Sequence, residues 1–301
     1  MVDDSAAASV SALSVPSRGA TLSVNRSGTP SGPTVVLVHG YPDNHRVWDR
    51  VVPQLQDLDV VTYDVRGAGR STAPEGRSAY RVERLVDDLV AVLDAVRPDG
   101  GAVHLVGHDW GSVQLWSAVF ASADDPRLRG RIASFVSISG PDLRLYGAYL
   151  RRSARERRWR RLAGQLSKSW YILAFQVPHL PELVVRRATG VVRRALTRSQ
   201  GLEDGHWSDS LARDAAHGIN LYRANAFRSA SAPLPERTHV PVTLVVALRD
   251  DFLSPSLYEG LEEHVPNLVR REVDAGHWLP WLRPEEVVAA VRAAVTAPSG
   301  L

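Results

Sequence analysis

The 301-residue chain contains no cysteine and a single lysine, Lys168. The lack of cysteine excludes disulfides, thiol nucleophiles and cysteine-ligated metal sites. No His-Glu-x-x-His motif or similar cluster of histidines and carboxylates indicates zinc. No apolar run reaches the roughly 20 residues of a transmembrane helix. The formal net charge is only +3, and no recognised nucleic-acid-binding module is present. We therefore expect neither a metal site nor nucleic-acid binding.

The first residues, Met1-Val2-Asp3-Asp4-Ser5, are acidic. A secretory signal begins with basic residues, so we expect no signal peptide and a cytoplasmic location. The Ala/Ser-rich stretch that follows predicts a disordered tail over residues 1–16.

Short apolar segments alternate with helical patterns along much of the chain, which is typical of a mostly parallel sheet flanked by helices. Helices are predicted near Val47–Leu55, Val82–Val96, Ser112–Ala121, Ser256–Glu263 and Pro284–Val295. Strands are predicted near Thr21–Val24, Thr34–Val38, Val60–Tyr63, Ala102–Val106, Ile132–Ser139, Val242–Leu248 and Leu268–Val273.

The strand pattern stops between Pro141 and about Pro241, where helical segments replace it. This interruption predicts an α/β core formed by residues 17–140 and 241–301, with a helical cap inserted as residues 141–240.

Gly107-His108-Asp109-Trp110-Gly111 has the form of a nucleophile elbow, G-x-S-x-G, with a carboxylate in place of the serine. The preceding strand and following helix place Asp109 on a sharp turn that the two glycines permit. A carboxylate suits attack on a saturated electrophilic carbon, which leaves an ester that water must hydrolyse. The alternative reading is an aspartate that caps the helix.

Partners for Asp109 follow in the order nucleophile, acid, histidine that hydrolase folds use. Asp250 and His277 each follow a predicted strand, and the carboxyl ends of strands are where open α/β sheets place their sites. We expect His277 to act as a base that Asp250 orients. Asp251 could be a solvated neighbour, and Asp142 is the alternative acid.

His39-Gly40-Tyr41-Pro42 closes another predicted strand. In such folds, a backbone N–H of this loop and that of the residue after the nucleophile form the oxyanion hole. Here these donors would be the amides of Tyr41 and Trp110.

Together these motifs resemble those of the epoxide hydrolases of the α/β-hydrolase superfamily, from about Val35 to Val295. The segment Tyr63–Ser71 is similar to a structural loop of this family. Ser169–Pro178 and Asn220–Asn225 look like the cap segments that carry its two substrate-activating tyrosines. The resemblance therefore implies that Tyr171 and Tyr222 bind the epoxide oxygen, and that no cofactor is needed.

Two other functions stay open. Haloalkane dehalogenases share the aspartate, the histidine and Trp110, although they usually carry a second halide donor, often asparagine, where Tyr41 stands. A hydrolase-fold protein that only binds small molecules is the other alternative, and fold analogy alone does not exclude it.

We expect an apolar epoxide substrate and a pocket lined by His39, Pro42, Trp170 and Trp278. Seven of the eleven residues from Arg151 to Arg161 are arginine, which indicates either a solvated helix face or contact with an anionic membrane or acidic partner. The sequence carries no signal for an oligomeric state.

Overall fold

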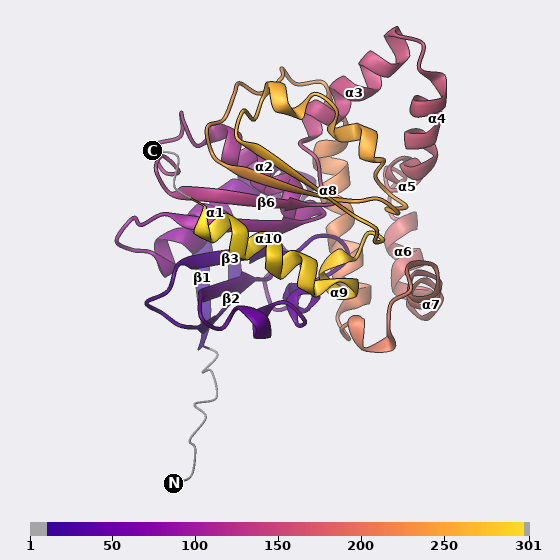
Figure 1. The fold of residues 1–301 in the computed structure, drawn as a ribbon. Coiled ribbons are helices and arrows are strands. Elements are labelled where there is room, and N and C mark those ends of the chain that lie inside the picture. Colours follow the sequence, from indigo (N-terminus) through magenta and orange to yellow (C-terminus); the bar gives the residue numbers. More distant parts are fainter. Residues whose placement is uncertain (1–10, 298–301) are drawn as a thin grey trace.

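The computed structural model describes residues 11–297. Within them, eight strands form one sheet in the order β1-β2-β4-β3-β5-β6-β7-β8 (Figure 1). β1 pairs antiparallel with β2, β2 pairs antiparallel with β4, and all other neighbours are parallel. The expected mostly parallel α/β sheet is therefore confirmed. The strands are β1 (Ser11–Ser17), β2 (Ala20–Gly28), β3 (Thr34–Val38), β4 (Asp59–Tyr63), β5 (Val103–His108), β6 (Ile132–Ile138), β7 (Val242–Ala247) and β8 (Leu268–Val273).

Helices cover both faces of the sheet and a third layer lies beside it (Figure 1). None of the helices within residues 11–297 is long and apolar enough to cross a lipid bilayer. The helices are α1 (Val82–Val96), α2 (Trp110–Ala121), α3 (Leu143–Arg155), α4 (Trp159–Lys168), α5 (Trp170–Ala174), α6 (Leu180–Arg187), α7 (Thr189–Gln200), α8 (Leu211–Ala230), α9 (Leu279–Leu282) and α10 (Pro284–Thr296).

Strand β3 shows why its sequence is apolar throughout. Successive side chains of a strand point to opposite faces. Val36 and Val38 therefore join the core layer that includes residues of α1 and α2, whereas Val35 and Leu37 join the layer that includes α10. Because both faces are covered, no position of this strand meets water.

Helices α3 to α8 follow β6 and precede β7, in the segment where the strand pattern of the sequence stops. Figure 1 shows them, in pink to orange, as a separate layer at one side of the sheet. The inserted helical layer is therefore present, and it lies where the core strands deliver their C-terminal loops.

The predicted disordered tail, residues 1–16, is wrong for its second part, since β1 spans Ser11–Ser17. Residues 1–10 lie outside the described part of the chain. Val15 is the one buried residue of β1. An edge strand with a single buried side chain has almost no apolar pattern, and backbone pairing to β2 holds it instead.

Two predicted helices are shorter than expected. The segment Val47–Leu55 forms two 3₁₀ turns, His45–Trp48 and Val52–Leu55, because Pro53 lacks the N–H that a continuous helix needs. The segment predicted as Ser256–Glu263 is likewise divided at Gly260, whose φ of 84° is left-handed.

Candidate active site

Asp109 lies on the tight turn between β5 and α2 and has φ 52° and ψ −122°. Such a conformation is strained for a residue with a side chain, at about 1–3 kcal/mol, and surrounding structure must impose it. Glycines supply the room. A Cβ on Gly111 would lie 2.0 Å from the Val38 carbonyl oxygen, and one on Gly40 would lie 2.3 Å from Asp109 Oδ1. The turn thus holds the carboxylate at the C-terminal edge of the sheet.

His277 and Asp250 reach Asp109 from the loops after β8 and β7. His277 Nδ1 lies 2.9 Å from Asp250 Oδ2, and His277 Nε2 lies 3.6 Å from Asp109 Oδ2. Asp250 Oδ1 accepts the backbone N–H groups of Phe252 and Leu253 at 2.7 and 3.0 Å. The three predicted residues therefore meet, and Asp250 is fixed by its own loop.

The charge on His277 follows from its two neighbours. Burial alone would lower the pKa of this imidazole, but the Asp250 and Asp109 carboxylates raise its pKa to about 10. At neutral pH the ring is therefore an imidazolium between two carboxylates. Asp250 makes the larger contribution to this raised pKa, and Asp109 adds to it.

Asp142, the alternative acid, is elsewhere. Its side chain caps α3 by accepting the N–H groups of Arg144 and Leu145 at 2.8 and 3.2 Å. Asp251 is exposed and accepts a hydrogen bond from Gln200 at 2.8 Å. These hydrogen bonds join both aspartates to groups other than His277.

The backbone amide of Tyr41 donates to Asp109 Oδ1 at 2.6 Å. This contact engages one carboxylate oxygen and leaves Oδ2 facing His277. The other expected donor, Trp110, is the first residue of α2. N–H groups in the first turn of a helix have no partner inside that helix, so they are available to an anion.

Tyr171 of α5 and Tyr222 of α8 lie together above Asp109, with ring centroids 5.6 Å apart. Burial and the Asp109 charge raise the pKa of Tyr171 above its ordinary value. Burial, Tyr171 and Asp109 likewise raise the pKa of Tyr222. Both phenols consequently keep their protons at neutral pH.

Two cavities meet at these residues. Asp109, Tyr171 and Tyr222 line both the larger cavity, about 540 Å³, and the smaller one, about 340 Å³. Most of the exposed wall in each is apolar, which suits an uncharged organic ligand. The larger cavity is also lined by the expected residues Pro42, Trp170 and Trp278.

The expectation that His39 lines the substrate pocket is wrong, because His39 lines neither of these cavities. Its buried ring accepts the Val65 N–H at Nε2 over 2.8 Å, so Nδ1 carries the proton and donates to the Gly40 carbonyl oxygen. His39 therefore fixes the loop that presents the Tyr41 amide.

Sequence reasoning missed several residues that support the site. Phe252 packs edge-on against His277, with ring centroids 4.8 Å apart, and lines both cavities. Lys168 donates to the backbone carbonyl of Asp250 from the C-terminal end of α4. Its standing as the sole lysine in an arginine-rich chain was the available signal. Phe252 gave no signal beyond its position two residues after Asp250.

His108, which directly precedes Asp109, is a further missed residue. Burial and the charge of His277 lower the pKa of His108 to about 4. The ring is neutral at pH 7 and its Nε2 lies 2.9 Å from the His277 carbonyl oxygen, so this nitrogen donates. His108 thereby holds the backbone of the loop that carries His277.

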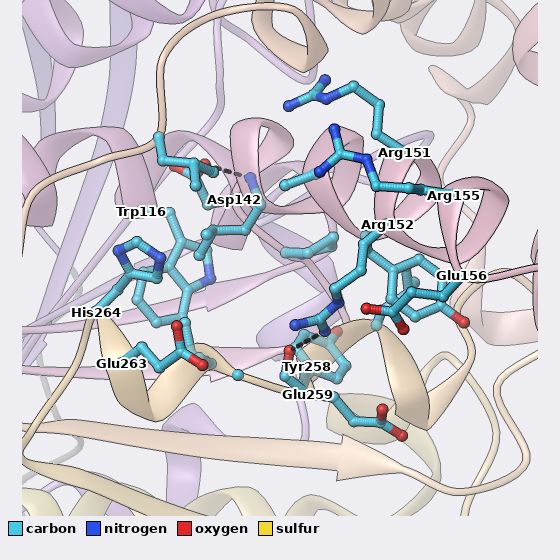
Figure 2. Close-up of a pocket in the computed structure, with 18 residues that line it drawn as sticks. Trp116, Asp142, Arg151, Arg152, Arg155, Glu156, Tyr258, Glu259, Glu263 and His264 are labelled. Atoms are coloured by element: carbon cyan, nitrogen blue, oxygen red, sulfur yellow. Dashed lines mark hydrogen bonds between the residues drawn. The ribbon is translucent and has the colours of Figure 1, made fainter. Parts of the chain in front are cut away.

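Another cavity, about 360 Å³, lies between α3 and residues 255–264 (Figure 2). Asp109 and His277 do not line it. Figure 2 shows Arg152 beside Glu156, and Arg152 donates to the Glu259 carbonyl oxygen at 3.1 Å. This pocket carries charges of both signs, and it lacks the arrangement around Asp109, in which a histidine lies between two carboxylates.

A protein-family model described as alpha/beta hydrolase fold matches residues 33–284. The chain belongs to the α/β-hydrolase fold family. Epoxide hydrolase A of Mycobacterium tuberculosis is 30% identical to it, over 92% of this chain and 94% of that protein. The resemblance to epoxide hydrolases expected from the motifs is therefore confirmed.

Two further similarities to known proteins were found. The structure of an epoxide hydrolase from Bacillus megaterium, in complex with an inhibitor, matches with a TM-score of 0.77 at 22% identity, over 94% of this chain and 99% of that one. "Probable oxidoreductase EphD" of Mycobacterium tuberculosis is 40% identical over 91% of this chain but only 47% of its own length. The chain thus spans about half of that relative.

Proposed function

We propose that the protein hydrolyses apolar epoxides to vicinal diols through an ester on Asp109. One observation carries this proposal: a carboxylate held by the Tyr41 amide and His277 faces two protonated phenols, Tyr171 and Tyr222, across an apolar cavity. A nucleophile and two acids on opposite sides of one space suit the opening of a strained ether ring.

In the first step, Asp109 attacks a ring carbon. The Tyr41 amide occupies Oδ1, so Oδ2 is the oxygen available to form the new C–O bond. The ring C–O bond breaks, and its oxygen takes a proton from Tyr171 or Tyr222. General acid catalysis of this kind contributes about 10²–10⁴ in rate.

Ester formation then switches the role of His277. Once Asp109 is esterified, one of the two charges that raise the pKa of His277 is gone. The imidazolium can return a proton to the tyrosinate and become a neutral base. It then removes a proton from water, which attacks the ester carbonyl.

The oxyanion of this second step forms at Asp109 Oδ1, where the Tyr41 amide already donates and the Trp110 amide begins α2. Collapse of the intermediate breaks the ester C–O bond, and the leaving alkoxide takes the proton that His277 holds, which completes the diol. The new Asp109 carboxylic acid then gives its proton to His277 and returns to the carboxylate. His277 ends as imidazolium, as it began, so each turnover consumes one water.

The test incubates the protein with styrene-type, alicyclic and long-chain epoxides and measures diol by gas chromatography. A parallel series with haloalkanes monitors halide release. We expect diol from the wild type, none from Asp109→Ala, and no halide. Halide release would assign the dehalogenase function instead, and ligand binding without any turnover would assign a binding protein.

A further inference from the structure

Charge is distributed very unevenly along the chain. Residues 151–200 contain twelve arginines and Lys168 but only Glu156 and Glu182, a net charge of +11, whereas the whole chain has +3. Both carboxylates are already paired, Glu156 with Arg158 and Glu182 with Arg223. Residues 151–200 therefore present a large excess of positive charge.

Large apolar side chains are exposed in the same segment. Of the fourteen exposed large hydrophobic residues within the described chain, nine lie between Trp159 and Val191. Trp159 is 59% exposed and Trp170 is 66% exposed. Single exposed apolar residues are ordinary, but such a concentration marks an interaction surface.

The helices that carry these residues are covered on one side at most. Neither α5 nor α7 contains a buried residue, α4 buries only Gln165, and α6 buries only Val185. In contrast, α10 buries five residues against the sheet. Figure 1 shows α4 to α7 in succession along the outer side of the cap.

The surface of α4–α7 also adjoins the walls of the two cavities at Asp109. Exposed Trp170 lines both cavities, exposed Val184 lines the larger one, and exposed Leu173 lines the smaller one. These three side chains therefore lie both on the exposed surface and along the cavity walls.

We propose that the outer surface of α4–α7 docks on an anionic lipid bilayer. Tryptophan, leucine and valine side chains enter the boundary between headgroups and acyl chains, while arginines contact anionic headgroups. A second copy of the chain fits poorly, because two faces of the same strong charge repel. Docking places the exposed residues that line both cavities against the lipid phase, in which apolar molecules concentrate.

The experiment is flotation of the full chain with vesicles of phosphatidylcholine, with or without one-third phosphatidylglycerol, at low and high salt. We expect binding to the anionic vesicles that weakens at high salt, and at least tenfold weaker binding to neutral vesicles. Replacing the exposed residues Arg157, Arg160, Arg186 and Arg187 by Gln should weaken anionic binding about tenfold or more, because each basic residue near the surface contributes.

A matched variant with Arg77, Arg129, Arg283 and Arg292 replaced by Gln loses the same charge from exposed positions of the core. It should bind within about twofold of the wild type, and thermal unfolding verifies that both variants fold. Equal effects of the two variants, equal binding to neutral vesicles, no flotation, or dimerisation through these arginines in sedimentation velocity would each overturn the proposal. Flotation measures binding alone, so its outcome is separate from that of the proposed hydrolysis.

Discussion

The two walls of the candidate site differ in how firmly the rest of the molecule holds them. On the core side, Asp109 and Asp250 follow the buried strands β5 and β7, His277 follows the edge strand β8, and further hydrogen bonds hold each of their loops. On the cap side, Tyr171 belongs to α5, which has no buried residue. Asp109, Asp250 and His277 are thus held by hydrogen bonds, whereas the wall that carries Tyr171 is partly exposed and open to variation.

The cap wall is itself divided. Tyr222 lies on α8, where buried Asn225 accepts the Val82 N–H at 2.9 Å and donates to the Tyr80 carbonyl oxygen at 2.8 Å. These bonds attach α8 to the core, whereas α5 has only partly buried packing. Tyr222 is therefore attached to the core through α8, whereas Tyr171 lies on the less buried helix α5.

Among the changes considered, removal of both phenols from the cap wall should have the largest effect on kcat/KM. We expect Tyr171→Phe/Tyr222→Phe to lower kcat/KM for epoxides by about 10²–10⁴, since no acid then remains for the ring oxygen. Each single variant should lose much less, and Tyr222→Phe more than Tyr171→Phe. Stopped-flow measurement of ester formation checks this, and single variants as inactive as the double one would contradict two shared acids.

Disturbing the core wall by one methyl group should have the next largest effect. In Gly40→Ala the new Cβ would lie 2.4 Å from Asp109 Cβ, so the nucleophile must shift. We expect about a 10²-fold loss of kcat, as for misplacement of a reacting group by about 1 Å. Gly164→Ala, whose Cβ meets nothing within 4 Å on cap helix α4, serves as the control and should keep full activity.

A third comparison concerns how far Asp250 and Asp109 each raise the pKa of His277. The charge of Asp250 is the stronger influence that raises the pKa of His277 to about 10. We expect its pKa, measured by NMR titration, to fall in both Asp250→Asn and Asp109→Ala, and further in the former. A pKa that is unchanged in Asp109→Ala would contradict the proposed switch.

The same pair makes folding stability depend on pH. The folded pKa of His277 lies above its unfolded value of about 6.5. Its stabilising contribution is therefore complete below about pH 6.5 and is lost as the pH rises toward 10. Denaturant unfolding of the wild type should show this loss, and Asp250→Asn should show less of it.

The smallest effect should come from the outer cap. Trp159→Ala removes a side chain that is 59% exposed, so we expect the free energy of unfolding to change by no more than about 0.5 kcal/mol. Trp48→Ala, at a fully buried core position, should cost about 3–5 kcal/mol in the same denaturant titration. A comparable loss in both variants would show that the cap surface is packed after all.

The sequence predicted the core wall better than the cap wall for a physical reason. Asp109 and Asp250 follow the largely apolar strands β5 and β7, and His277 follows the more polar edge strand β8. The C-terminal ends of parallel strands meet at one edge of a sheet. The two predicted helices that the structure interrupts contain Pro53 and Gly260, and these helix-breaking residues are also visible in the sequence. The edge strand β1 was missed because only Val15 of it is buried.

What the sequence could not supply was packing between segments far apart in the chain. His39 carries a motif position but turns to the Val65 amide rather than to the cavity. Phe252 and Lys168 act through contacts with His277 and Asp250 that no local pattern encodes. Tyr171 and Tyr222 came from family resemblance, since helical periodicity alone treats a tyrosine as an amphipathic core residue.

The most direct test of the account is a single turnover of an epoxide in ¹⁸O-labelled water, followed by mass analysis of the peptide that contains Asp109. If water attacks the ester carbonyl, heavy oxygen enters the Asp109 carboxylate, and His277→Gln accumulates the alkylated peptide instead. An unlabelled Asp109 in protein that has produced labelled diol would show that water attacks the epoxide directly, and the covalent mechanism would be wrong.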